Sequence, residues 1–373
     1  MDSAPTLTDG TVILRAHRAD DAQGCLEQCQ DPVSREWTTV PVPYSIDDAR
    51  TFVTEVMPGG WADGSSWGFA VEVDGRYAGT VEVRDEGEGR MEVAYGSHPW
   101  VRGTGTFTRA VRLLVDWGFA DRGARVLVWR ANRGNWASRK LAWRLGFTLE
   151  GTIRSALPQR GELRDAWVGT LLPDDVREPT GVWLATPELT DGVVRLRALR
   201  DSDLARVVEA AGDDRTARWL GRMPSPYTEE DAHTWLQQTI ESAATGDAVT
   251  WAVTAADDDV LLATVNLFDV TVGGIAEVGF WAHPGARGRG VATRATALAL
   301  RHGFETLELV QVQGHAALGN TASRHALEAG GLREAGVVRL GTFIRPEGRV
   351  DAMRYDVLVE EWREAQPRAR AGF

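Results

Sequence analysis

The sequence predicts an α+β protein made of two tandem copies of one domain. Short motifs return in the same order along the second half of the chain, and a glycine-rich loop precedes a long helix in both halves. The repeated motifs are Leu7–Gly10 with Leu189–Gly192, His98–Pro99 with His283–Pro284, Gly118–Phe119 with Gly303–Phe304, and Asn135–Arg139 with Asn320–Arg324. The repeat has the length of a whole domain and is too long for one unit of a solenoid.

The expected domain boundaries follow from these motifs and from one proline-rich stretch. Residues 1–172 form the first expected domain and residues 188–373 form the second. Residues 173–187 contain three prolines and a glycine, which is typical of a linker, although Val182–Leu184 could dock on a domain. The tail at residues 366–373 is expected to be loose.

Composition excludes several classes of protein. The chain has 373 residues, of which 43% are hydrophobic and 25% are charged, as in globular proteins. Its net charge of −12 argues against a nucleic-acid binder. The sequence shows neither a signal-peptide pattern nor an apolar run near ~20 residues, so we expect a cytoplasmic protein that does not bind membranes.

The two cysteines, Cys25 and Cys29, are expected to be reduced thiols in or near a core. Their i, i+4 spacing places both on one helix, where a disulfide would have poor geometry. No histidine cluster accompanies them, so we expect no metal site.

The first copy predicts the element order β-α-α-β-β-β-α-β-α-β-β, and the second copy follows it from Val193 to about Trp362. Alternating apolar residues predict the strands, Ser45 predicts a helix cap, and Asp74–Gly75 predicts a tight hairpin. The expected strands are 12–15, 67–73, 77–83, 90–97, 126–130, 148–155 and 163–171, and the expected helices are 20–30, 45–56, 135–145 and one from the glycine loop to 121.

The loop Ala286–Ala292 and its counterpart Val101–Phe107 have the composition of an anion site. Glycines let a backbone approach a phosphate closely, and the N–H groups and dipole of a helix N-terminus favour negative charge. Arginines at the rim can add charge-assisted hydrogen bonds. A solvated helix start would have the same composition, and the repetition of the loop favours a binding site.

This order of elements resembles the GNAT acetyltransferase superfamily and, within it, the RimL/RimJ-like branch. Three features carry the resemblance: the Arg-x-x-Gly-x-Ala loop at Arg287, the Asn-x-x-Ser helix starts at Asn135 and Asn320, and closing hairpins with Asp165 and Asp351. The resemblance implies two domains, each a mixed, mostly antiparallel twisted sheet flanked by helices. It also implies acetyl-CoA as the cosubstrate, no metal, and direct transfer to a primary amine.

In this family acetyl-CoA lies between splayed fourth and fifth strands, with its pyrophosphate on the glycine loop. The resemblance therefore implies cofactor-binding roles for Arg287, Gly288, Arg289, Gly290, Val291, Ala292 and Asn320, and in the first copy for Arg102, Gly103, Gly105 and Asn135. Phe107 replaces the small residue that matches Ala292, and it could crowd the pyrophosphate or turn into the core. We expect the second domain to be the catalyst and leave open whether the first binds CoA.

Two pairs of residues are candidates for proton transfer. An alkyl ammonium must lose a proton before it attacks, and Glu277, with Glu92 as its counterpart, lies on the strand beside the expected thioester. Ser323 and Ser138 resemble the serine that this branch places near the CoA sulfur. Structural roles remain open for all four, since a strand glutamate can pair with a neighbour and a serine early in a helix can bond backbone.

Asn320 and Asn135 are good helix N-caps, which alone can explain them, although the family uses this residue to orient pantetheine. His98 and His283 each precede a proline and are expected to end a strand rather than to catalyse.

The acceptor is expected to bind between the first two helices of each copy. The candidate residues are aromatic, namely Trp219, Tyr227, Trp281, Trp37 and Tyr44. Aromatic rings can hold a cationic amine, and core packing is the alternative for each. The acceptor is a small-molecule amine or, as the alternative, a peptide N-terminus. A non-catalytic acyl-CoA sensor is a further reading, and a monomer or homodimer is expected.

Overall fold

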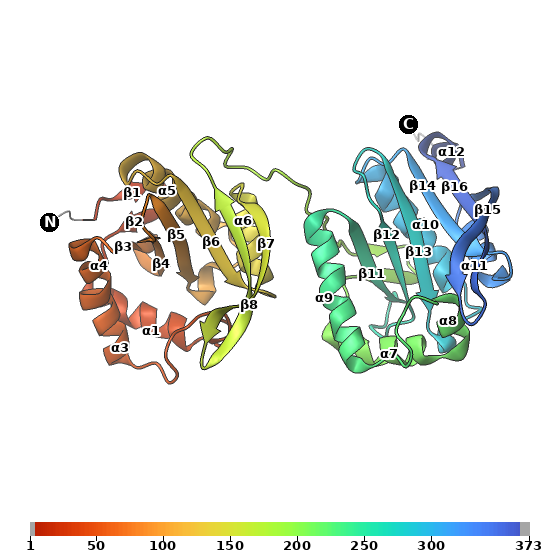
Figure 1. Cartoon of the computed structure of the whole chain (residues 1–373), viewed down its shortest axis with the longest axis horizontal. Helices are drawn as coiled ribbons and strands as arrows, with labels where there is room; N and C mark the ends of the chain where they lie inside the picture. The colour runs from red at the N-terminus through yellow and green to blue at the C-terminus, as the bar shows by residue number, and fades with distance from the viewer. Residues whose placement is uncertain (1–3, 366–373) are drawn as a thin grey trace, which may run out of the picture. The chain divides into compact units, whose positions relative to one another are not determined.

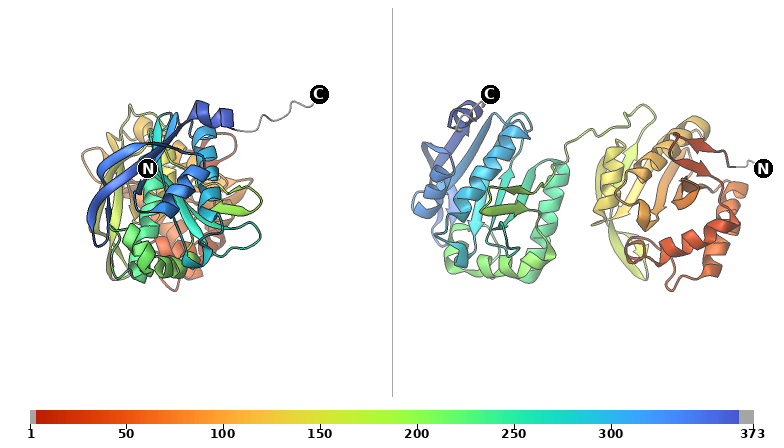
Figure 2. Two further views of the ribbon diagram at one scale, coloured as in Figure 1. Left: turned by 90° about the vertical axis from the view of Figure 1, so that its right-hand side faces the viewer. Right: turned by 180° about the vertical axis from the view of Figure 1, so that it is seen from behind.

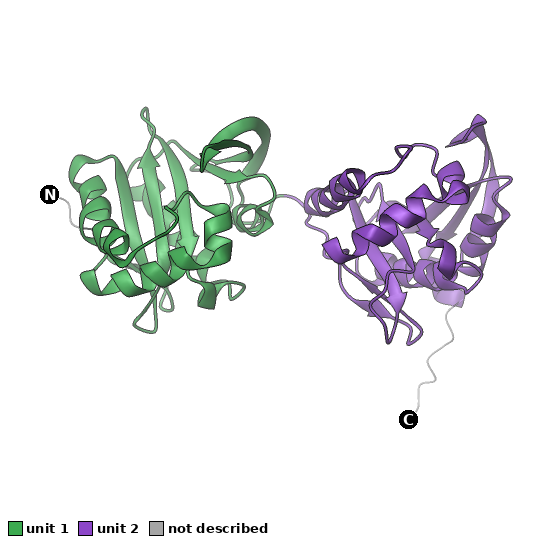
Figure 3. Ribbon diagram, turned by 90° about the horizontal axis from the view of Figure 1, so that it is seen from below, with its two compact units in different colours: residues 1–180 green, residues 181–373 purple. Residues whose placement is uncertain are grey.

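The computed structural model describes residues 4–365, which divide into two compact units, 1–180 and 181–373 (Figure 3). The loose tail expected at 366–373 lies outside the described residues. The division falls inside the stretch 173–187 that was expected to be a linker. Each unit is an eight-stranded mixed sheet with helices on both faces, so the expected α+β class with two tandem domains is confirmed.

The elements of the first unit follow the predicted order, with an additional short strand, β1, and additional short helices. They are β1 (Leu7–Thr8), β2 (Ile13–Arg15), η1 (Ala19–Asp21), α1 (Ala22–Gln30), α2 (Pro32–Trp37), α3 (Ile46–Thr51), the π-helical η2 (Phe52–Val56), α4 (Met57–Asp63), β3 (Ser66–Val73), β4 (Arg76–Asp85), β5 (Arg90–Ser97), η3 (Pro99–Val101), α5 (Thr106–Asp121), β6 (Val126–Asn132), α6 (Trp136–Arg144), β7 (Thr148–Gln159) and β8 (Glu162–Leu171). The strand order is β1-β2-β3-β4-β5-β6-β8-β7, and β5 and β6 are parallel.

The second unit repeats this plan (Figure 1). Its elements are β9 (Leu189–Thr190), β10 (Val194–Arg197), η4 (Asp201–Asp203), α7 (Leu204–Gly212), α8 (Asp214–Trp219), α9 (Glu229–Thr245), β11 (Ala248–Ala255), β12 (Ala263–Phe268), β13 (Ile275–Ala282), η5 (Pro284–Ala286), α10 (Val291–Glu305), β14 (Gln311–Ala317), α11 (Thr321–Ala329), β15 (Arg333–Ile344), β16 (Gly348–Leu358) and α12 (Val359–Ala365). The strand order is β9-β10-β11-β12-β13-β14-β16-β15, and β13 and β14 are parallel.

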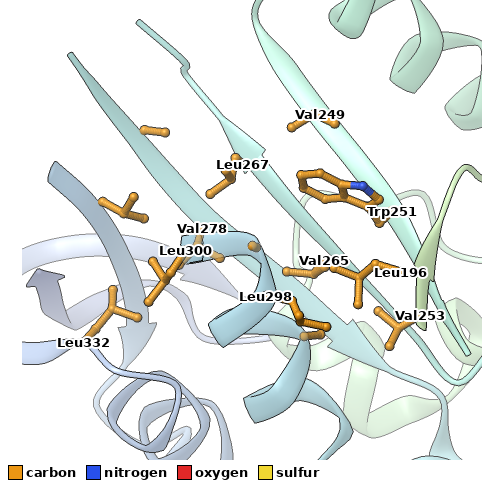
Figure 4. Packing of buried hydrophobic residues seen from close by; sticks show 14 of the residues in the cluster. Leu196, Val249, Trp251, Val253, Val265, Leu267, Val278, Leu298, Leu300 and Leu332 are labelled. Atoms are coloured by element: carbon orange, nitrogen blue, oxygen red, sulfur yellow. The ribbon is translucent and has the colours of Figure 1, made fainter. Parts of the chain in front are cut away.

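Each sheet buries both of its faces. In the second unit, α10 lies over one face and is seen in pale blue from behind in the right-hand panel of Figure 2. The main core lies between α10 and the sheet, where Leu298 lies near Val265 and Leu300 near Val278 (Figure 4). A smaller cluster on the opposite face joins α7 and α9 to the sheet. The first unit has the same two clusters.

The stretch between the units is largely docked on one unit or the other. The Arg177 guanidinium lies 4.7 Å from the centroid of the Phe119 ring in the first unit. The Leu184 N–H donates to the carbonyl of Ala243 at 2.8 Å, and the Leu184 side chain is buried in the core of the second unit. The docking considered for Val182–Leu184 therefore occurs.

Two expected boundaries were wrong. The helix that Ser45 caps was expected to end near Val56, yet helical structure continues through η2 and α4 to Asp63. Pro58 lies at the start of α4, where its missing N–H is tolerated, and buried Met57 packs on the sheet. Strand β7 also runs to Gln159, beyond the expected end at Ser155.

The local predictions for the two cysteines and for the two closing hairpins are confirmed. Cys25 and Cys29 are free and buried. Asp165 accepts a hydrogen bond from the N–H of Ser155 at 2.9 Å, and Asp351 accepts one from Leu340 at 2.9 Å. Ser155 and Leu340 both have positive φ where the closing hairpin bulges, so each aspartate stabilises an irregular backbone.

Among residues 4–365, no helix combines the length and apolar character of a membrane span.

Candidate active site

A cleft with a volume of about 1110 Å³ opens in the second unit. Its lining includes the glycine loop, parts of β13 and β14, and the tryptophans Trp219, Trp235 and Trp281. The residues that matter for its chemistry are Trp219, Trp235, Glu277, Val278, Gly279, Phe280, Trp281, Arg287, Gly288, Gly290, Val291, Ala292, His315, Asn320 and Ser323. A cleft of this size can enclose a ligand larger than a simple amine.

The cleft exists because β13 and β14 separate. Their parallel pairing begins at Ile275 and ends at the pair Glu277–Gln313. Beyond that point β13 continues to Ala282 paired with β12, while β14 continues to Ala317 paired with β16. The strand edges that face each other therefore no longer bond across the gap, and the backbone of Val278–Phe280 lines the cleft. Backbone N–H groups on such an edge can bond an oxygen that gains negative charge.

The glycine loop forms the other end of the cleft. Gly288 and Gly290 have φ of 73° and 71°, and a Cβ at either position would meet nothing within 4 Å. Gly290 precedes α10, whose N-terminus receives no side-chain cap. Its first N–H groups therefore stay available to an anion, so the loop fits the pyrophosphate of a CoA ligand. Val291 is buried, and Arg289 is exposed and does not line the cleft.

The loop arginine is tied to another helix. Arg287 forms an ion pair with Asp213, and its guanidinium donates to the Thr216 hydroxyl at 2.6 Å. Asp213 is the N-cap of α8 and accepts from the N–H of Thr216 at 3.0 Å. The hydrogen bond that Arg287 donates to Asp213 lowers the pKa of the Asp213 carboxyl from its ordinary value. The visible role of Arg287 is thus to hold the loop to α8.

The candidate proton-transfer residues of this unit lie in the cleft. Glu277 Oε1 lies 3.0 Å from His315 Nδ1, a histidine that the sequence analysis did not single out. The side-chain amide oxygen Oδ1 of Asn320 accepts from the N–H of Ser323 at 3.2 Å, so Asn320 is the expected N-cap of α11. Among the residues that the structure describes, the Ser323 hydroxyl has no hydrogen-bond partner. It therefore remains available to a ligand.

The aromatic candidates divide into two groups. Trp219 and Trp281 line the cleft, together with Trp235, whose ring centroid lies 6.4 Å from that of Trp281. Tyr227 does not line it, because its side chain is buried in the cluster beneath α7 and α9, where burial raises its pKa to about 12.

In the first unit the counterparts of these residues also pack in the protein. Tyr44 is buried beside Cys25, and its hydroxyl lies 3.6 Å from the Cys25 sulfur. The Trp37 ring lies against the backbone of Gly134, as the Trp219 ring does against Gly319.

Side chains fill the corresponding gap in the first unit. Trp129 on β6 is buried, and its Nε1 donates to Tyr95 Oη at 3.1 Å and to Ser138 Oγ at 3.0 Å. Tyr95 Oη lies 2.8 Å from Ser138 Oγ, which closes the network. The second unit has Gly314 and Phe280 at the positions of Trp129 and Tyr95. The candidate Ser138 is therefore engaged within the protein, whereas Ser323 faces a cleft.

The candidate Glu92 is likewise engaged. Its carboxylate lies 3.1 Å from Arg130 and 3.5 Å from Arg84. Arg84 also pairs with Glu82, and Arg130 pairs with Glu86 at 2.5 Å. This ion-pair network covers the sheet face that carries Glu277 and His315 in the second unit.

The glycine loop of the first unit has the same backbone conformation as that of the second unit, but Phe107 replaces the small residue Ala292. Gly103 and Gly105 have φ of 77° and 83°, and Arg102 pairs with the helix cap Asp31 at 2.6 Å, as Arg287 does with Asp213. Phe107 is buried in the core. Of the two orientations considered for this ring, the structure therefore has the one that points inward.

The remaining candidates have structural roles. Asn135 caps α6 by accepting from the N–H of Ser138 at 3.2 Å. His283 Nδ1 accepts from the N–H of Gly285 at 3.1 Å, and His98 Nδ1 accepts from Trp100 at 3.5 Å. Both histidines thus shape the turn after their strand, as expected.

Comparison with known proteins assigns the family. A family model described as "Acetyltransferase (GNAT) domain" matches residues 11–148 and again residues 194–333. The chain therefore belongs to the GNAT acetyltransferases and contains two copies of their domain. Such proteins are acyl-CoA-dependent acyltransferases, and the expectation of an enzyme is confirmed.

Similar proteins correspond to one half of the chain. "Putative ribosomal N-acetyltransferase YdaF" of Bacillus subtilis is 27% identical over 45% of this chain and 93% of its own length. "Uncharacterized N-acetyltransferase p20" of Bacillus licheniformis is 26% identical over 45% of this chain and 96% of its own length. The structure of Mycobacterium smegmatis RimJ in complex with CoA-disulfide aligns at 22% identity and a TM-score of 0.42, over 46% of this chain and 84% of that one.

Proposed function

We propose that the second unit is an acetyl-CoA-dependent N-acetyltransferase that acts on a primary amine, and that the first unit is not catalytic. The observation that carries this proposal is the difference between the two gaps in the sheets. The gap after Glu277 opens into the cleft that Val278–Phe280 and His315 line, whereas in the gap after Val93 the side chains of Trp129 and Tyr95 bond to each other. We therefore expect a ligand to enter the second gap only.

The residues present suggest a division of roles along the cleft. The loop at Gly288–Gly290 and the start of α10 would hold the pyrophosphate of acetyl-CoA, and Asn320 and Ser323 would contact its pantetheine arm. The edge of β13 at Val278–Phe280 would bond the thioester oxygen. Ser323 would donate a proton to the departing sulfur, whose thiol has a pKa near ~8.5 in a typical case.

The tryptophans and the glutamate of the cleft favour an acceptor amine with an apolar part. Trp219, Trp235 and Trp281 line this part of the cleft, and Glu277 adds negative charge. Indole faces attract cations, and they also bury apolar surface. We propose a small-molecule amine as the acceptor. A peptide N-terminus is the second candidate, favoured by the relative that is named a ribosomal N-acetyltransferase.

Calorimetric titration with acetyl-CoA tests the assignment of the two units. We expect one molecule bound per chain. Binding of two molecules, or none, would contradict the proposal.

Thiol release tests the reaction. The panel would contain phenethylamine, spermidine, an aminoglycoside, and peptides with free N-terminal serine or alanine. We expect faster release with at least one amine than with water alone, and mass spectrometry of the product should show one added acetyl group. Release that depends only on the peptides would replace the small-molecule acceptor with the second candidate.

A further inference from the structure

Glu277 and His315 meet on one face of the sheet of the second unit, just where β13 and β14 separate. His315 lies two residues beyond Gln313, the partner of Glu277, so both side chains point to the same face. The distance from Glu277 Oε1 to His315 Nδ1 is 3.0 Å, and the side chains are 20% and 24% exposed. Both line the cleft that Trp219, Trp235 and Trp281 also line.

The carboxylate determines which imidazole nitrogen is available. A neutral histidine carries one N–H donor and one lone pair, and a carboxylate next to Nδ1 favours the tautomer with Nδ1–H. The lone pair is then on Nε2. Among residues 4–365, no side chain forms a hydrogen bond with His315 Nε2, so a ligand in the cleft can approach it. We infer that His315 accepts the proton that the acceptor ammonium loses, and that Glu277 is its positioning residue.

At the position of His315 the first unit has a residue that cannot accept a proton. Arg130 occupies the position of His315, and it pairs with Glu92 as His315 pairs with Glu277. An arginine keeps its proton under all ordinary conditions and cannot act as a base. The contact with the strand glutamate is therefore common to both units, and only the residue that can take up a proton differs.

This inference rests on the proposed function and completes its proton balance. The ammonium transfers one proton to His315 Nε2, and the neutral nitrogen forms a bond to the acetyl carbon. The bond from that carbon to sulfur breaks, and the sulfur takes the second proton of the amine by way of Ser323. The products are the amide and CoA thiol, and His315 later releases its proton to water.

Glu277 acting alone is the competing assignment, and three variants separate the two. His315→Arg introduces the residue of the first unit and keeps a hydrogen-bond donor beside Glu277. His315→Gln removes the base with a neutral side chain, and Glu277→Gln keeps the size of the positioning residue. For the best amine of the panel above, we expect both His315 variants to lower kcat at least ~100-fold. We expect Glu277→Gln to lower it about 10-fold, with the KM for acetyl-CoA within about threefold of wild type in all three.

The kinetic outcomes are distinct. If wild-type protein acetylates no amine of the panel, the proposed function fails. If it does, and His315→Gln retains more than a tenth of kcat while Glu277→Gln loses activity, Glu277 is the base and the inference about His315 is wrong. Unchanged acetyl-CoA stoichiometry and an unchanged thermal transition in His315→Arg would show that the second unit remains folded.

A spectroscopic measurement tests the same point without turnover. Long-range proton–nitrogen correlation spectra of the free protein report which ring nitrogen of each histidine is protonated, and the chain has seven histidines. The signal lost in His315→Arg belongs to His315. A neutral ring with its lone pair on Nε2 supports the inference, and a ring with its lone pair on Nδ1 overturns it.

Discussion

The tip of the Phe107 ring occupies the space that a side chain on Gly79 would need. A Cβ at Gly79 would lie 2.5 Å from Phe107 Cζ, which is shorter than any normal contact. In the second unit the corresponding residues are Ala263 and Ala292, because Ala263 pairs with the end of β13 as Gly79 pairs with the end of β5. The large residue of one unit is thus matched by the loss of a side chain on the neighbouring strand. Phe107 is part of a repacked core and not an obstacle in an otherwise intact cleft.

Phe107→Ala should destabilise the first unit. The substitution removes a buried ring and leaves a cavity, which costs about 3–5 kcal/mol in typical cores. We expect the calorimetric transition of the first unit to move to lower temperature while that of the second unit, which acetyl-CoA raises, stays in place. Leu149→Ala in the same unit is the control, since Leu149 is 40% exposed and its loss should change little. Equal shifts for both variants would contradict the packing role of Phe107.

Ala292→Phe should block the cleft of the second unit. The ring cannot turn inward as it does in the first unit, because Ala263 carries a Cβ and is fully buried. It is expected to occupy the space beside the start of α10 and to weaken acetyl-CoA binding at least tenfold by calorimetry. Phe107→Ala serves as the comparison and should leave the affinity and the stoichiometry unchanged. Wild-type affinity in Ala292→Phe would place the cofactor elsewhere.

Asp213→Asn should reveal the tie between the glycine loop and α8. Asparagine caps a helix as well as aspartate does, so the substitution removes only the ion pair with Arg287. Because Arg287 lowers the pKa of Asp213 in the folded state, the stabilisation is present above the ordinary carboxyl pKa and is lost as the pH falls through the lowered value.

At pH 7 we expect the variant to be less stable by about 1 kcal/mol and to bind acetyl-CoA more weakly. Denaturant titrations should show this difference in stability shrinking below about pH 4. Asp214→Asn, at the exposed neighbouring position, is the control. A stability difference that does not depend on pH would mean that the effect does not come from the carboxylate.

His17→Leu should change the response of the first unit to acid. Burial lowers the pKa of His17 to about 4, and its ring packs against Phe52 with centroids 5.8 Å apart. Between pH ~6.5 and ~4 the unfolded chain takes up a proton that the folded chain does not, so wild-type stability falls as the pH falls, by roughly 2–3 kcal/mol.

Leucine is the residue of the second unit at this position, and it cannot titrate. We therefore expect His17→Leu to remove this part of the acid slope in unfolding experiments. His233→Leu changes an exposed histidine and should leave the slope as it is. An identical slope in wild type and His17→Leu would show that other groups cause the acid sensitivity.

Sequence alone was sufficient for features that depend on a few neighbouring residues. The caps at Asn135 and Asn320, the free glycine loops and the aspartates of the closing hairpins all follow from local backbone geometry. The duplication fixed the domain plan. The continuation of the helix past Val56 was missed, because Pro58 and two glycines predict a helix end while the packing of Met57 on the sheet outweighs them.

Only the tertiary structure decided which of the repeated residues line a cleft. Trp129 has the pattern of an ordinary strand residue, and nothing local shows that its indole bonds to Tyr95 and Ser138, whereas the second unit has a glycine, Gly314, at this position. Glu277 and His315 come from different strands, and their contact depends on the register of β13 and β14. Local order is set by short-range sterics and capping, which the sequence displays directly. Clefts and proton-transfer pairs are set by long-range packing, which emerges only when the strands are side by side.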